Sequence, residues 1–223
     1  MTISILGIGW LTKSEYGCIV KGEQTSYGEA NGPDSLVKQG IFAYPVKNFG
    51  RFDWASRMTC FGVALALRDA GIAYSATQKQ DIGIVATSDE GSLRTDIEYF
   101  RDYLDSGRTL SRGNLFIYTL PSSPAGEAAI HFGLLGPMMY AGGADALATV
   151  LDTAADMVKA GEARMMVAGK AADDEALFFV IGESSTAAAG RDLDEVKAIV
   201  SAKAGIAEMV QKFSLKEARK AIA

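Results

Sequence analysis

Apolar and polar residues alternate along the chain in stretches that predict strands and helices in turn. Short apolar runs are typical of buried strands, and they occupy residues 2–8, 81–87, 138–141, 164–169 and 176–182. Apolar and small residues at helical spacing predict helices between these runs, over 56–71, 92–105, 124–134 and 144–160. Strands that alternate with helices in this order favour a layered α/β domain.

The helix expected over 92–105 has the clearest apolar face. Leu93, Ile97, Phe100 and Leu104 recur at intervals of three and four residues, which places them on one side of a helix. The preceding part of the chain is less regular. Residues 11–55 are rich in Gly, Asn and Pro, with scattered apolar positions, so we expect irregular structure there.

The C-terminal sequence predicts a separate tail. Residues 183–191 (ESSTAAAGR) are small and polar, which is typical of a linker. We therefore divide the chain into a main domain over 1–182, this linker, and a tail over 192–223.

The tail carries two capping-box patterns, Asp192 with Glu195 and Ser214 with Glu217, which predict helices. Its apolar positions indicate that it packs onto the main domain; these are Leu193, Val196, Val200, Met209, Val210 and Phe213. We expect the tail to cap the sheet.

Composition excludes several classes of function. The 223 residues carry a net charge of −5, and no cluster of Lys and Arg offers the basic surface that nucleic acids require. The apolar runs are far shorter than the roughly 18 residues that span a bilayer. The N-terminus lacks the basic and apolar regions of a secretory signal. We expect a cytoplasmic protein that binds neither nucleic acid nor membrane.

Cysteine and histidine are scarce, which limits metal and acid–base chemistry. The two cysteines, Cys18 and Cys60, fit a reducing cytoplasm, and together with the single His131 they cannot form a zinc site. Cys60 lies in the middle of a helix among apolar residues, so packing is its expected role. His131 lies next to Phe132 on an apolar helix face, which is typical of a partly buried, hydrogen-bonded core histidine. We expect no metal and no cofactor.

Three loops could suggest other chemistry. GIGWLT (7–12) resembles a dinucleotide-binding turn, but Thr12 occupies the third glycine position, and strand-end glycines explain it better. The acidic loops Asp89–Glu90–Gly91 and Asp173–Asp174–Glu175 could hold a metal or perform carboxylate chemistry. Acidic loops after strands are more often solvated.

Four different segments follow one another in the order and spacing of a known family's motifs: SRMTCFGVALALRDAGI (56–72), DIGIVATSDEGSL (81–93), LPSSPAGEAAIHFGLLGP (120–137) and GEARMMVAGKAADD (161–174). Together they resemble the N-terminal half of β-ketoacyl synthases, which have the thiolase-like fold. The resemblance covers about residues 1–182. It implies an α/β half-domain with a mixed sheet and helices on both faces.

The same resemblance implies a catalytic cysteine at the start of the helix over 144–160. Counting back from Gly161 places it at Ala144, and counting forward from Pro137 places it at Asp145. Neither residue is a thiol, so the position of the nucleophile is vacant. The family's two active-site histidines and oxyanion loop belong to a C-terminal half, which the tail replaces here. The resemblance therefore implies the fold without condensation chemistry.

The family's matching strand pairs antiparallel with its mate across a dimer two-fold. In this chain that strand consists of Met138, Met139, Tyr140 and Ala141. An apolar strand left as an open edge invites aggregation, so we expect another subunit to cover it. The expected partner is a second copy or a full-length ketosynthase, and an acyl carrier protein is a further candidate.

Polar residues form a stripe on the helix over 144–160. They recur within about 120° of the helical circumference, at Asp145, Thr149, Asp152, Thr153, Asp156 and Lys159. A solvated face is one interpretation. The other is a docking strip, on which Asp145, Asp152 and Asp156 receive Lys or Arg of a partner.

Three functional hypotheses follow. The first is a cysteine-less ketosynthase-like protein of the chain-length-factor type, a non-catalytic partner of a ketosynthase in fatty-acid or polyene-type biosynthesis. The second is a stand-alone homodimeric binding or structural protein without an acyl substrate. The third, an enzyme of unrelated chemistry, rests on the carboxylates alone. A long apolar tunnel ending near Ala144 would favour the first hypothesis, and a charged surface without a tunnel would favour the second.

Overall fold

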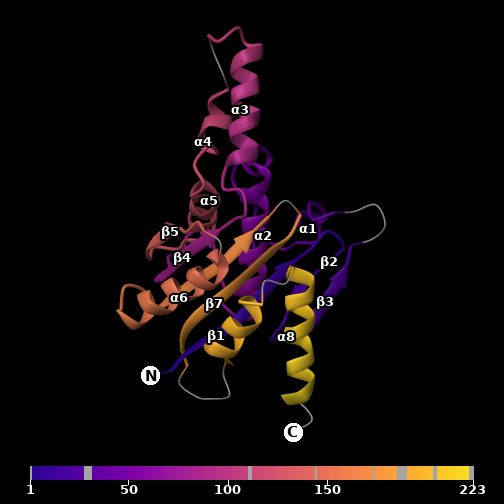
Figure 1. Cartoon of the computed structure of the whole chain (residues 1–223), viewed down its shortest axis with the longest axis vertical. Coiled ribbons are helices and arrows are strands. Elements are labelled where there is room, and N and C mark those ends of the chain that lie inside the picture. The colour runs from indigo at the N-terminus through magenta and orange to yellow at the C-terminus, as the bar shows by residue number, and fades with distance from the viewer. Residues whose placement is uncertain are drawn as a thin grey trace.

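A mixed β-sheet runs through the centre of the computed structural model (Figure 1). The structure describes residues 2–27, 32–109, 112–143, 145–172, 174–184, 190–202 and 205–220, the last six by their backbone only. Within these ranges the sheet has eight strands, in the order β3-β2-β1-β7-β6-β4-β5, with β8 paired to β1. Their bounds are β1 Thr2–Leu11, β2 Glu15–Cys18, β3 Glu23–Ser26, β4 Ile82–Thr87, β5 Met138–Tyr140, β6 Met165–Ala171, β7 Ala176–Ser184 and β8 Arg191–Asp192.

The strand directions bring four carboxyl ends to one edge of the sheet. β4 is parallel to β5 and to β6. β7 is antiparallel to both β6 and β1, so β1 runs parallel to β6. The strands β1, β4, β5 and β6 therefore end on the same side, at Leu11, Thr87, Tyr140 and Ala171. Open α/β sheets bind ligands outside such carboxyl ends.

Helices cover both faces of the sheet, as expected for the α/β class. The longer ones are α2 Trp54–Asp69, α3 Leu93–Asp105, α5 Ser123–Phe132, α6 Ala146–Lys159, α7 Leu193–Val200 and α8 Ile206–Lys220. The short ones are α1 Ser35–Lys38, the 3₁₀ turn η1 Phe49–Arg51 and α4 Gly113–Ile117. α2 and α5 pack in the hydrophobic core on one face, and α6, α7 and α8 pack in the core on the other. α3 and α4 extend beyond the sheet (Figure 1).

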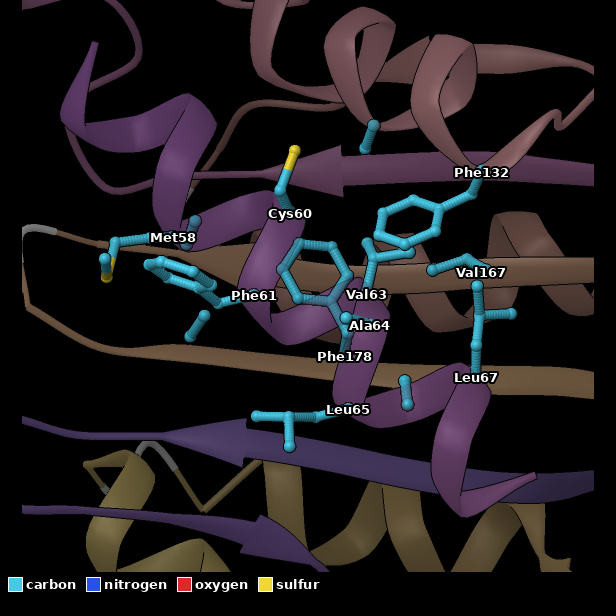
Figure 2. Packing of buried hydrophobic residues seen from close by; sticks show 14 of the residues in the cluster. Met58, Cys60, Phe61, Val63, Ala64, Leu65, Leu67, Phe132, Val167 and Phe178 are labelled. Carbon is cyan, nitrogen blue, oxygen red and sulfur yellow. The ribbon is translucent and has the colours of Figure 1, made fainter. Parts of the chain in front are cut away.

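Helix α2 lies directly against β1 because two glycines leave room for its backbone. A Cβ atom at Gly7 or Gly9 would overlap the backbone of α2 at Ala70 and Ala66. Both glycines belong to the GIGWLT segment and lie inside the strand, so helix packing accounts for them. Figure 2 shows apolar side chains of α2, among them Phe61, in one cluster with Phe132 of α5, Val167 of β6 and Phe178 of β7.

A buried carboxylate joins the end of α2 to the first strands. Asp69 is 5% exposed. Its carboxylate accepts hydrogen bonds from the backbone N–H groups of Ile8, Val20 and Lys21, at 2.7, 3.0 and 2.9 Å. Burial raises the pKa of Asp69, and the three N–H donors oppose that rise because they stabilise the charged form.

The C-terminal helices pack on the face of the sheet that α6 also covers. Their buried apolar residues share one cluster with β1 and β7; they are Val196, Ile199, Val200, Ile206, Met209, Val210 and Phe213. β8 pairs with β1, and the buried Arg191 donates a hydrogen bond of 2.9 Å to the carbonyl of Phe213. Hydrophobic burial is therefore the main attachment of the tail.

Two sequence-based expectations about local structure were wrong. Residues 11–55 hold the hairpin of β2 and β3 as well as α1 and η1, elements too short and too exposed to show periodicity. The capping box at Ser214 does not begin a helix, because Ser214 lies inside α8 and donates to the carbonyl of Val210 at 2.9 Å. The capping box at Asp192 is correct, since its carboxylate accepts from the N–H of Glu195 at 2.9 Å.

Candidate functional site

A pocket of about 760 Å³ lies at the edge where the strands end. Its walls come from the turns after β1, β4 and β6 and from the first turns of α2 and α3, and Ala207 of α8 contributes to its rim. Phe52 and Trp54 provide its large apolar surfaces. This position matches the crevice where open α/β sheets place their ligands.

The lining of the pocket is mixed, with charged residues beside the apolar surfaces of Phe52 and Trp54. Its basic residues are Lys13, Arg57 and Arg94, and its acidic residues are Asp53, Asp89, Glu90, Glu98, Asp174 and Glu175. A saturated acyl chain gains its binding energy from apolar contact, and charged groups lose their hydration when such a chain covers them. The charged part of the lining is therefore poorly suited to an acyl chain.

Residues of both acidic loops line this pocket, namely Asp89, Glu90, Asp174 and Glu175, whereas Asp173 lies outside the described residues. Asp89 forms a salt bridge of 2.7 Å with Lys170 at the end of β6, and Asp174 forms one of 2.9 Å with Lys13. Burial raises the pKa of Glu175, and nearby Lys170 acts in the opposite direction. The ion pairs offset the charges of Asp89 and Asp174. Among the described residues no group of His, Cys, Asp and Glu is arranged to hold a metal.

The floor of the pocket is fixed by the helix caps. Asp53 caps α2 by accepting from the backbone N–H of Ser56 at 2.9 Å. Its other oxygen accepts from the hydroxyl of Thr95 in α3, at 3.1 Å. One carboxylate thus holds two helix starts together.

The turn before α6, where the resemblance implies a nucleophile, carries none in its described residues. Gly142 and Gly143 follow β5, and Gly143 has a φ of 135°, a conformation that favours glycine. Asp145 is exposed at the start of α6, where its carbonyl accepts from the N–H of Thr149 at 3.1 Å. Ala144 lies outside the described residues.

Tyr140 connects this turn to the pocket. Its hydroxyl lies 3.3 Å from the Oγ of Ser88, which lines the pocket. The described residues of the turn do not themselves line it. The turn and the pocket are therefore neighbours on one edge of the sheet.

The thiols and the histidine are poorly placed for nucleophilic catalysis. Burial raises the pKa of Cys18 to about 12 and also raises that of Cys60, so both remain thiols at neutral pH. Cys60 is packed within the core around α2 (Figure 2). Burial lowers the pKa of His131 to about 4. The packing role expected for Cys60 and the buried position expected for His131 agree with the structure.

His131 lies in an aromatic cluster on α5. Its ring centroid is 4.4 Å from that of Tyr44, 4.8 Å from that of Phe132 and 5.3 Å from that of Phe42. The ring is not among the residues that line the pocket, and within the described residues its Nε2 has no hydrogen-bond partner. The expected hydrogen bond is thus not found at Nε2.

The polar stripe on α6 faces outward, and the tail of the same chain meets part of it. Asp152 forms a salt bridge of 2.5 Å with Lys197 of α7. Asp156 pairs with Lys159 of its own helix at 3.1 Å. The sequence pattern identified the carboxylates and missed Lys197, because nothing in the sequence predicts which helix packs beside α6.

The strand expected to pair across a dimer is an open edge within the described residues. β5 pairs with β4 alone, and Met138 and Met139 are 48% and 37% exposed. Tyr140 and Ala141 are half-buried. The apolar face of the helix expected over 92–105 is also exposed, on α3.

Comparison with known families decides the relationship. The model of the β-ketoacyl synthase N-terminal domain matches residues 12–207. The chain belongs to the β-ketoacyl synthase family. This match confirms the resemblance to the N-terminal half of β-ketoacyl synthases that the sequence indicated. No curated protein matches the sequence.

Solved structures of ketosynthases share the fold. The ishigamide ketosynthase/chain length factor has a TM-score of 0.55 and 15% identity, over 84% of this chain and 63% of that one. A β-ketoacyl synthase from Burkholderia phymatum has a TM-score of 0.56 and 16% identity, over 82% and 59%. A type II polyketide synthase acyl-carrier protein in complex with its ketosynthase, bound to the hexaketide, gives 0.57 and 11%, over 82% and 58%.

This chain spans about three fifths of the length of those structures. Their similarity confirms the thiolase-like α/β fold that the sequence predicted. Among the described residues no helix is both long and apolar enough to cross a bilayer.

Proposed function

We propose that this protein is a non-catalytic ketosynthase-like subunit, which pairs with a catalytic ketosynthase in fatty-acid or polyene-type biosynthesis. The observation that carries the proposal is the turn before α6. Its described residues Gly142, Gly143 and Asp145 offer no thiol, hydroxyl or amine to attack a thioester. Ala144, the other candidate position, has a methyl side chain.

The remaining nucleophiles support the same proposal. Cys18 and Cys60 are at most 1% exposed, and burial raises the pKa of each, so neither presents a thiolate to a substrate. Ser88 and Ser92 line the pocket, but a serine needs a general base, and the single His131 is not part of that lining.

A partner role is supported by the open edge of the sheet. β5, with Met138 and Met139 exposed, is the strand through which we propose that the protein pairs with a ketosynthase subunit. One similar structure is a ketosynthase/chain length factor, and another is a ketosynthase with its acyl-carrier protein. We propose a ketosynthase as the main partner and a carrier protein as a third component.

Purification of the tagged full-length chain from its own cells tests the partner role. We expect a full-length ketosynthase in a fixed ratio to this chain, and a loss of that ketosynthase when Met139 is changed to Asp. The matched control is Val37→Asp on α1, which is 44% exposed and lies away from β5. Recovery of this chain with no ketosynthase would contradict the proposal.

One observation favours the alternative, a stand-alone homodimeric binding or structural protein. Many charged residues line the pocket, and Lys197 of α7 already forms a salt bridge with Asp152, a carboxylate of the stripe that a partner could have used. Native mass spectrometry separates the two functions. A ketosynthase or a retained acyl group favours the proposed subunit, whereas a dimer of this chain alone, without acyl groups, favours the alternative.

A further inference from the structure

The pocket at the ends of the strands carries an excess of negative charge. Six carboxylates and three basic side chains line it. Two ion pairs at the pocket use a partner outside the lining, because Arg57 pairs with Asp34 and Asp89 pairs with Lys170. These two outside partners have opposite charges, so the excess stays at three negative charges. The field of the pocket therefore attracts cations.

Three carboxylates from separate turns account for this excess. Asp53, Glu90 and Glu175 line the pocket and form no salt bridge within the described residues. The other three carboxylates of the lining each pair with a lysine or an arginine. Asp53 lies before α2, Glu90 after β4 and Glu175 before β7. Asp53 already accepts hydrogen bonds from neutral donors at the two helix starts, which leaves Glu90 and Glu175 as the carboxylates best able to receive a ligand.

The surroundings of Glu175 add an energetic reason for a bound cation. Burial raises the pKa of Glu175, and nearby Lys170 opposes that rise without cancelling it. A carboxylate that is partly removed from water is stabilised by a positive charge close to it. A cation beside Glu175 supplies that charge.

The apolar part of the lining limits the kind of cation that fits. Trp54 is half-buried at the start of α2, and an indole ring attracts an ammonium group within about 6 Å of its face. The cavity of about 760 Å³ lies in the range of about 300–1,000 Å³ that is typical of pockets for organic ligands. Within the described residues no group of His, Cys, Asp and Glu is arranged to hold a metal ion. The lining therefore fits an organic cation better than a metal ion.

We propose that this pocket binds a small organic cation, an ammonium group joined to an apolar part. The ammonium group lies against Glu90 and Glu175, and the apolar part lies against Trp54 and Phe52. The proposal does not depend on which partner the protein has or on whether it is catalytic.

An organic anion is the competing ligand, because the first turns of α2 and α3 line the pocket and helix starts attract anions. The start of α2 is already capped by the carboxylate of Asp53. The basic side chains of the lining are also paired with carboxylates. An anion would have to displace these carboxylates, so the charge distribution favours a cation.

Tryptophan fluorescence reports occupation of the pocket. The chain has two tryptophans, and Trp10 is 2% exposed and absent from the lining, so a ligand in the pocket perturbs Trp54. The probe is 2-phenylethylammonium, compared with its neutral analogue 2-phenylethanol and its anionic analogue 3-phenylpropanoate. We expect the full-length chain to bind the ammonium compound saturably, with a dissociation constant of about 10 mM or tighter. Both analogues should bind at least about tenfold more weakly.

Charge-removing variants locate the ligand. Glu90→Gln should weaken binding of the ammonium compound by about threefold, and the double variant with Glu175→Gln by about tenfold. Glu162→Gln is the matched control, because Glu162 is exposed, precedes β6 at the end opposite the pocket and changes the net charge by the same amount as Glu90→Gln. Trp54→Phe should abolish the fluorescence change, while the ammonium compound still raises the melting temperature of that variant. Circular dichroism verifies that each variant is folded.

Three results would overturn the proposal. The first is no saturable change up to about 50 mM of the ammonium compound, well above the weakest affinity expected. The second is binding of the neutral or the anionic analogue as tight as that of the cation. The third is a Glu90→Gln, Glu175→Gln double variant that binds the cation as tightly as the Glu162→Gln control, since the ligand would then lie elsewhere.

Discussion

Asp69 illustrates how one side chain can join segments far apart in the sequence. It accepts from the N–H group of Ile8 in a buried hydrogen bond, and from those of Val20 and Lys21 in partly buried ones. Removing the carboxylate leaves those donors without an acceptor, and each unsatisfied buried donor costs about 1–3 kcal/mol.

We therefore expect Asp69→Ala to lower the free energy of unfolding by about 3 kcal/mol or more. Asp69→Asn should cost less, because the amide oxygen can still accept from Ile8 and Val20. Urea unfolding measures both, with Asp105→Ala on the exposed end of α3 as the control. Equal stability of Asp69→Ala and the control would show that the three hydrogen bonds contribute nothing.

His131 makes stability depend on pH in a predictable direction. Burial lowers its pKa from 6.5 to about 4 in the folded protein. The unfolded chain therefore binds a proton before the folded chain does, and stability present above pH 6.5 is lost as the pH falls towards 4. The slope reaches about 1.4 kcal/mol per pH unit.

His131→Phe should remove this slope while keeping a ring among Tyr44, Phe42 and Phe132. The raised pKa values of Asp69 and Glu175 act in the opposite sense, since their contribution is lost as the pH rises. They are present in both proteins, so the difference between the two unfolding curves isolates His131. The chain has one histidine, which makes the assignment unique. If the free energies of unfolding of the two proteins changed in parallel between pH 6.5 and 5, the assignment to His131 would be refuted.

At the scale of elements, the tail is held by apolar burial more than by charge. Phe213 is fully buried, and the centroid of its ring lies 6.1 Å from that of Phe179. Lys197 and Asp152 form a partly exposed salt bridge, with side chains 29% and 53% exposed, and such pairs contribute about 1 kcal/mol or less.

We expect Phe213→Ala to cost about 3–5 kcal/mol, and Lys197→Ala about 1 kcal/mol or less. Added salt should shrink only the second effect, because it screens exposed charges. Denaturant unfolding at two salt concentrations measures both. A Lys197→Ala cost equal to that of Phe213→Ala would show that charge dominates the attachment.

The sequence predicted the large elements well and the small ones poorly. The ranges 56–71 and 144–160 became α2 and α6, because long helices with a buried face show their periodicity. The hairpin of β2 and β3 was missed, since four-residue strands with polar residues carry no such signal. The division of the chain at 183–191 stays a prediction, because residues 185–189 lie outside the described ranges.

At the scale of the whole molecule, the sequence identified the vacant turn and could not identify the pocket. The family's sequence pattern gives the position of this turn, residues 142–145, directly. The pocket unites Lys13, Asp89 and Glu175 from three separate turns, and only the strand directions bring these turns to one edge. The exposure of the α3 face was equally hidden, because an apolar helix face looks the same whether it faces a core or a partner.

The central claim is that the chain retains the ketosynthase scaffold without its reaction. The most direct test is intact mass spectrometry of the purified chain after incubation with an acyl thioester, with a catalytic ketosynthase as the positive control. We predict that the mass of this chain stays unchanged while the control gains one acyl group. A stable gain of one acyl group on this chain, lost on changing Cys18 or Cys60 to Ser, would contradict the account.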